Sequence, residues 1–105
     1  MRKANVVRNT KETKISCSIN LDGTGIANIN TGVGFFDHMI ELFVHHSLID
    51  MELKTDGDTN VDFHHSVEDT AYAIALATNK ALGEKKGIAR YGFFYVPMDE
   101  CLSRC

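Results

Sequence analysis

Two adjacent histidines, His64 and His65, stand at the start of a long run of helix-forming residues, and Glu68 follows closely. If a helix begins near Asp62 or Phe63, His64 and Glu68 share one of its faces, because residues four apart are neighbours on a helix surface. Those two side chains could then bind one metal ion. His65 is rotated ~100° around the helix, so the paired histidines indicate two ions, one on each side.

The ligand types narrow the choice of metal. Imidazole and carboxylate without thiolate suit Mn, Fe or Zn ions and disfavour a closed structural zinc site. Asp62 and Asp69 are candidates to accept a hydrogen bond from an imidazole N–H and so fix its tautomer. The competing interpretation is a capping box, with Ser66 as N-cap and Asp69 in place of the usual glutamate. In that register both histidines precede the helix, and spacing alone leaves both interpretations open.

Three more histidines fall in a second candidate helix, residues 35–48. His38 lies among apolar side chains, where a lone histidine is more often a core residue bonded to a carbonyl than a ligand. His45 and His46 come at the end of this helix, where the helix dipole favours a partly charged imidazole.

The elements that must position these residues begin with strands. Residues 4–9 and 14–21 are predicted strands, the second because its apolar residues alternate with polar ones. The Asp-Gly of the following LDGTG stretch is typical of a hairpin turn, and a short strand covers 26–30. Alternation from Ile49 predicts a strand that ends at the next Asp-Gly.

Two helices complete the pattern. Residues 35–48 have so wide an apolar surface that a buried helix is expected. Residues 64–82 form the second helix, which Gly83 is placed to end as a C-cap residue. The core stripe expected of the second helix is Val67, Ala71, Ile74, Thr78 and Ala81.

A β-β-β-α-β-α unit is therefore complete by about residue 83, and the domain division follows from it. Residues 1–83 form a first half-domain that carries the histidine motif. Residues 84–105 are a linker and the start of an incomplete second half-domain, in which apolar residues alternate again. Residues 12–17 and 100–105 share a glutamate and a cysteine at the same spacing, an echo that by itself decides nothing.

Composition excludes several classes of protein. The 105 residues are 44% hydrophobic and 24% charged, which is ordinary for one globular domain and excludes disorder and low complexity. The net charge of -3 gives no reason to expect a nucleic-acid partner. No apolar run could cross a membrane, and none follows the basic N-terminus as in a secretory signal. The odd count of cysteines (17, 101 and 105) indicates free thiols and a cytoplasmic location.

Several motifs in order identify a family. The chain resembles the imidazoleglycerol-phosphate dehydratases, enzymes of histidine biosynthesis, across essentially its whole length. The matching stretches are RNTKET (8–13), INLDGTG (19–25), TGVGFFDHM (31–39), DFHHSVED (62–69), ALGEKKGIARYG (81–92) and PMDE (97–100). The resemblance implies an α+β fold of the ribosomal S5 domain 2-like kind. In it a four-stranded sheet is backed by two helices and forms one half of a duplicated β-β-β-α-β-α protomer.

The resemblance also implies a metal cofactor and an oligomeric assembly. The family binds two metal ions, usually Mn²⁺, and forms a homo-oligomer of 24 subunits whose active sites are shared between subunits. By position, His38, His64, His65 and Glu68 match metal ligands. His64 and Glu68 are expected on one ion, and His65 with His38 on the other.

The same resemblance implies which residues contact the substrate. Glu12 matches an acidic residue beside the substrate and is the candidate for proton transfer, with His38 and His65 as further catalytic candidates. Arg90 matches a residue that binds the substrate phosphate, for which a guanidinium fork is well suited. His46 matches a recurrent family histidine whose role is left open.

The chemistry explains why two ions are needed. The family's substrate, imidazole glycerol phosphate, carries an imidazole ring, a glycerol chain and a phosphate. Cations on both ring nitrogens favour loss of the ring proton, as a bound cation acidifies water. Electrons from the ring can then expel the side-chain hydroxyl, and a base removes the adjacent proton. The resulting enol becomes the ketone, imidazole acetol phosphate.

The chain departs from the family at three points. Phe63 replaces the second aspartate of the motif, Leu42 stands where some relatives have a polar residue, and the second half, with its own HHxxE motif, is missing. Four protein ligands are too few for two roughly six-coordinate ions. The isolated chain is therefore expected to bind metal poorly and, with an exposed sheet edge, to aggregate. The alternatives are a truncated, non-catalytic relative and a different metal-dependent enzyme such as a hydrolase.

Overall fold

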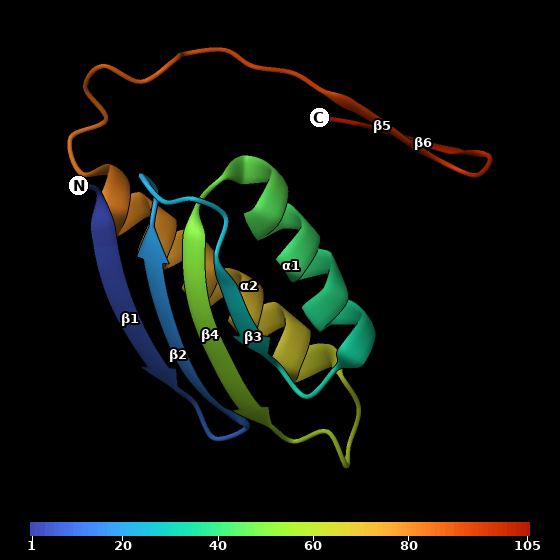
Figure 1. The fold of residues 1–105 in the computed structure, drawn as a ribbon. Coiled ribbons are helices and arrows are strands. Elements are labelled where there is room, and N and C mark those ends of the chain that lie inside the picture. The colour runs from blue at the N-terminus through green and yellow to red at the C-terminus, as the bar shows by residue number, and fades with distance from the viewer.

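The computed structural model describes residues 1–105 and has an α+β fold. A mixed four-stranded sheet is covered on one face by two helices, and a separate two-stranded hairpin follows (Figure 1). This confirms the predicted fold class. The elements are β1 Lys3–Asn9, β2 Thr13–Asn20, β3 Ala27–Asn30, α1 Gly34–Ser47, β4 Asp50–Gly57, α2 His64–Leu82, β5 Tyr95–Met98 and β6 Cys101–Arg104.

The four-stranded sheet has the order β1-β2-β4-β3. β2 is antiparallel to both of its neighbours, and β3 runs parallel to β4. The register aligns apolar residues across the sheet: Cys17 is opposite Leu53, which is opposite Ile29 in turn. α2 packs against β1, β2 and β4, whereas α1 packs against β3 and β4.

Strand β2 shows the predicted alternation directly. Ile15, Cys17 and Ile19 are buried against the helices, whereas the residues between them face solvent. Burial raises the pKa of the Cys17 thiol to about 11, because the thiolate would lose its hydration. Cys17 thus behaves as a small apolar core residue.

The hairpin predicted at LDGTG is wrong, because β4 lies between β2 and β3. The loop is held to β4 by Asp50, whose Oδ1 accepts hydrogen bonds from the backbone N–H groups of Thr24 (2.9 Å), Gly25 (3.1 Å) and Ile26 (2.9 Å). These backbone bonds lower the pKa of Asp50. Local turn chemistry is therefore overridden by a side chain more than twenty positions away, and the chain crosses to the far side of β4.

The stripe predicted for α2 is only partly correct: Ala81 is buried and Ile74 is partly buried against the core, whereas Ala71 is exposed. The buried residues are Ser66, Thr70, Ala73, Ala77 and Ala81. Small side chains let the helix lie close to the sheet, and a buried hydroxyl is acceptable when it is bonded: Thr70 and Thr55 share a hydrogen bond of 2.6 Å. Val67, at the start of the predicted stripe, is exposed.

Helix α1 is less buried than predicted. Only Ile40 and Val44 are buried, whereas Phe35 and Phe43 are 70% and 54% exposed. The helix covers one edge of the sheet, so a single stripe of its wide apolar surface reaches the core. The expectation of a wholly buried helix is wrong for this chain.

The last elements form a hairpin of their own. β5 and β6 are antiparallel, and every residue in them is exposed. Cys101 lies in a β-strand, and all three cysteines are free, as predicted. No helix in the chain has the length and apolar character required to span a membrane.

Candidate active site

The first turn of α2 begins at His64, as one of the two interpretations required. The N-cap residue, Phe63, contributes no side-chain cap, and Asp62 Oδ1 accepts a hydrogen bond of 2.9 Å from the backbone N–H of His64. Ser66 lies within the helix and is fully buried, so the capping-box interpretation is wrong.

His64 and Glu68 lie together on one face of this turn. His64 Nε2 is 3.1 Å from Glu68 Oε2, and the two side chains are 69% and 67% exposed. With Phe63 and Val67 they line a shallow surface hollow. An imidazole and a carboxylate at this separation offer a pair of donors to a cation from solvent.

His65 engages a different carboxylate. Its Nδ1 lies 2.8 Å from Asp58 Oδ2, and this hydrogen bond raises the pKa of His65. The rings of His64 and His65 are 5.9 Å apart between centroids and inclined at 72°. Successive residues of one helix turn thus present their imidazoles to separate acidic partners.

Asp58 was missed by sequence reasoning, which named Asp62 and Asp69 as candidate partners of an imidazole. Asp69 instead accepts hydrogen bonds from Thr13 Oγ1 at 2.7 Å and from Arg8 at 3.3 Å. The bond from Thr13 is the main reason that the pKa of Asp69 is lowered. The available signal for Asp58 was its place directly after the end of β4, which carries it to the edge of the sheet where α2 begins.

Glu12 lies beside this region, in the turn between β1 and β2. Its backbone oxygen accepts a hydrogen bond of 3.1 Å from the N–H of Asp58. Its carboxylate is also among the charges that favour protonated His65. A polar hollow of about 210 Å³ lies at the β1–β2 turn and the end of β4, and its lining includes Glu12 and Asp58.

His38 lies near the start of α1, and the N-terminal ends of both helices are at the same end of the molecule (Figure 1). No group of three or more His, Cys, Asp or Glu side chains converges in a way that could hold a metal ion. The chain therefore does not assemble the expected His38–His65 ligand set into a complete site of its own.

Arg90 is exposed in the segment that leaves the other end of α2. Its guanidinium lies 5.8 Å from the ring centroid of Tyr91. A helix of this length spans roughly 28 Å, so α2 separates Arg90 from His64 and His65. The chain alone does not bring Arg90, the residue predicted to bind phosphate, close to the histidines.

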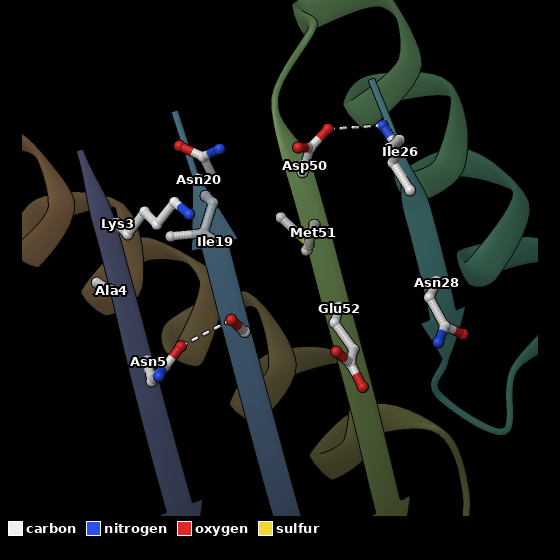
Figure 2. Close-up of a pocket in the computed structure, with 11 residues that line it drawn as sticks. Lys3, Ala4, Asn5, Ile19, Asn20, Ile26, Asn28, Asp50, Met51 and Glu52 are labelled. Carbon is white, nitrogen blue, oxygen red and sulfur yellow. Dashed lines mark hydrogen bonds between the residues drawn. The ribbon is translucent and has the colours of Figure 1, made fainter. Parts of the chain in front are cut away.

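The largest hollow lies elsewhere, on the open face of the sheet (Figure 2). It has a volume of about 730 Å³, and its lining includes no histidine. Its polar side chains are partly satisfied among themselves, since Ser18 donates a hydrogen bond of 2.7 Å to Asn5. Size alone does not make it the site, because the groups capable of chemistry gather at the start of α2.

Comparison with known proteins agrees with the motif at this helix. The family model described as imidazoleglycerol-phosphate dehydratase matches residues 31–105. The chain belongs to the imidazoleglycerol-phosphate dehydratase family. Imidazoleglycerol-phosphate dehydratases from Hydrogenovibrio crunogenus and Methylorubrum populi are 56% and 57% identical to it over 99% of the chain.

The family likeness extends to structure. The crystal structure of imidazoleglycerol-phosphate dehydratase from Staphylococcus aureus matches 97% of this chain with a TM-score of 0.79 and 35% sequence identity. The match covers 54% of that protein, and the two sequence relatives are covered to 53% each. The chain thus spans about half the length of the relatives it matches.

Proposed function

We propose that the chain forms the N-terminal part of an enzyme that eliminates water from imidazole glycerol phosphate to give imidazole acetol phosphate, a cytoplasmic step of histidine biosynthesis. The observation that carries this proposal is the first turn of α2, where His64 lies beside Glu68 and His65 is bonded to Asp58. Family membership over nearly the whole chain supports the assignment.

We also propose the domain division: residues 1–83 as a first half-domain and 84–105 as a linker and the start of a second. The hairpin β5–β6 repeats the antiparallel pairing of β1–β2. Glu12 and Glu100 each stand immediately before the second strand of their hairpin. This correspondence supports the proposal that the sequence echo marks the same position in two similar units.

Two Mn²⁺ ions are the proposed cofactors. The donors at the start of α2 fit such an ion, because they are imidazole and carboxylate groups that solvent can reach. His64 and Glu68 would hold one ion, and His65 with His38 would contribute to the other. Bound Mn²⁺ would supply Lewis acidity that withdraws electrons from the imidazole ring of the substrate. Since no three donors converge in this chain, the remaining ligands must come from elsewhere in the enzyme, the substrate or water.

The proton-transfer role is assigned to Glu12. The charge of its carboxylate favours protonated His65, and Glu12 lines the same polar hollow as Asp58. A substrate held at the histidines would therefore lie near this carboxylate. A carboxylate there can take the proton from the carbon next to the departing hydroxyl. Water and the enol are then the products, and the enol becomes the ketone.

Phosphate binding is assigned to Arg90, whose exposed guanidinium can form two parallel hydrogen bonds to phosphate oxygens. Because α2 separates Arg90 from the histidines of its own chain, we propose that it serves an active site shared between subunits. A homo-oligomer, expected to contain 24 subunits, would supply such neighbours.

The competing function is a non-catalytic relative that folds and binds metal weakly, which the lack of a converged ligand set favours. The purified protein, with Mn²⁺ added, is incubated with imidazole glycerol phosphate, and the ketone product is followed by proton NMR. Turnover that His64→Ala abolishes and the matched control His45→Ala retains supports the dehydratase. Metal binding without turnover, even after the half of the Hydrogenovibrio crunogenus dehydratase that this chain does not cover is added, supports the non-catalytic alternative.

A further inference from the structure

The two histidines at the start of α2 differ in how firmly they are held. His64 meets Glu68, and both side chains are about two-thirds exposed. His65 meets Asp58, whose side chain is only 21% exposed. An exposed ion pair restrains its partners weakly because water competes for both groups. Asp58 is the better-anchored carboxylate of the two.

The backbone around Asp58 explains why it is well anchored. Its N–H donates a hydrogen bond of 3.1 Å to the carbonyl oxygen of Glu12, which ties the end of β4 to the β1–β2 turn. The preceding residue, Gly57, lies directly beneath the buried side chain of Ser66, so closely that a Cβ there would overlap Ser66 Oγ. The first turn of α2 therefore packs closely against the end of β4, and this contact places His65 next to Asp58.

The chemistry of the bond determines which ring nitrogen carries hydrogen. An ionised carboxylate only accepts hydrogen bonds, so Nδ1 of His65 must be the N–H donor. In the neutral ring the lone pair is then on Nε2, the only nitrogen that can bind a cation. The negative charges of Glu12 and Asp62 also favour the protonated ring, but Asp58 is the one carboxylate hydrogen-bonded to it.

We propose that Asp58 is a positioning residue that fixes the Nδ1–H tautomer of His65 and so presents Nε2 to a metal ion. The identity of the ion rests on the proposed function, whereas the tautomer does not. Because the N–H of Asp58 is also bonded to Glu12, one residue sets the imidazole and the candidate base relative to each other. In the dehydratase Asp58 acts through His65 and touches neither substrate nor metal.

The tautomer is tested in the metal-free 105-residue chain. Long-range ¹H–¹⁵N spectra of the histidine rings are recorded at about pH 9, well above the ordinary imidazole pKa of about 6.5. The wild type is expected to show His65 protonated at Nδ1. Asp58→Ala is expected to shift His65 to the Nε2–H form that free imidazole side chains prefer, with His64 unchanged.

Two further variants make this result decisive. Asp56→Ala, which removes an exposed carboxylate two positions earlier, is the matched control and should leave the tautomer as in the wild type. Asp58→Asn keeps the shape of the side chain if the alanine variant does not fold. It should give a mixture, because an amide can accept from Nδ1–H or donate to Nδ1. An unchanged Nδ1–H tautomer in both Asp58 variants overturns the proposal.

Addition of Zn²⁺, a diamagnetic substitute for Mn²⁺, then separates this inference from the proposed function. The change in the ¹⁵N shift of His65 Nε2 should need about 10–100-fold more Zn²⁺ in Asp58→Ala than in the wild type. The His64 signals should respond equally in both proteins. An equal response of His65 in both proteins overturns the link between Asp58 and the metal. A tautomer that changes as expected, with no Zn²⁺ effect on either histidine, supports the role of Asp58 and counts against the metal site.

Discussion

The two regions of the chain, residues 1–83 and 84–105, both form antiparallel strands but differ completely in burial. All twelve residues of the hydrophobic core lie between Val6 and Ala81. The hairpin β5–β6 has backbone hydrogen bonds of its own but no buried residue. Backbone pairing alone therefore produces strands, whereas a core requires a face that helices can cover.

The comparison also locates the apolar surface that this chain leaves exposed. Phe35 and Phe43 of α1 belong to the first region, and Phe93 and Phe94 lead into the hairpin of the second. Isolated exposed apolar residues are ordinary, but aromatic side chains in such numbers are not. The first region is thus complete as a sheet with helices, while part of its helical surface has no cover within the chain.

The largest contrast is expected between two strand leucines, one from each region. Leu53→Ala removes a side chain that is 1% exposed and should lower the free energy of unfolding by about 2–5 kcal/mol. Leu102→Ala, in the exposed hairpin, should change it by less than about 0.5 kcal/mol. Urea denaturation followed by circular dichroism measures both. Equal losses would break the comparison, because they would show that the hairpin belongs to the same core.

A smaller difference in stability is expected between substitutions of Gly57, at the candidate site, and Gly92, in the second region. In Gly57→Ala the new methyl group overlaps Ser66 Oγ, so the start of α2 must move, at a cost of about 1–3 kcal/mol. Gly92→Ala meets nothing within 4 Å in the second region and is the matched control. Thermal denaturation measures both changes. Retention of the His65–Asp58 contact in a fully stable Gly57→Ala protein would contradict the close-packing argument.

Deletion of residues 84–105 tests the independence of the first region. Since no core residue is lost, the urea midpoint of the shortened chain should match that of the whole chain. The amide NMR signals of β2 and β4 should also stay in place. A large fall in the midpoint would instead mean that the second region stabilises the sheet in solution.

A small, pH-dependent effect is expected from the ion pair that joins Arg2 to Asp22 at 2.8 Å. The hydrogen bond from Arg2 lowers the pKa of Asp22 from 3.8 to about 2. Its stabilisation is therefore present above pH 3.8 and lost as the pH falls through about 2. Asp22→Asn should remove this part of the pH dependence, measured by urea denaturation between those values, while Asp99→Asn in the second region should retain it.

Sequence patterns predicted the helices and strands of the first region well, but not which of their residues pack against other elements. Alternation located β2, and the apolar run and Gly83 located α2 with its observed ends. Hydrophobicity shifted most of the buried stripe of α2 by one position, because buried Ser66 and Thr70 are polar residues that fit a close contact. It also overestimated the burial of α1, since a wide apolar surface does not reveal how much of it the rest of the chain can cover.

The sequence by itself determined the periodicities, the helix that carries Glu68, and the family to which the chain is related. Each of these depends on residues close in the chain or on their order along it. Only the tertiary structure decided that β4 separates β2 from β3 and that Asp58, rather than Asp62 or Asp69, binds His65. Both outcomes depend on which distant segments pack together, and that packing is governed by burial and side-chain volume across the whole sheet.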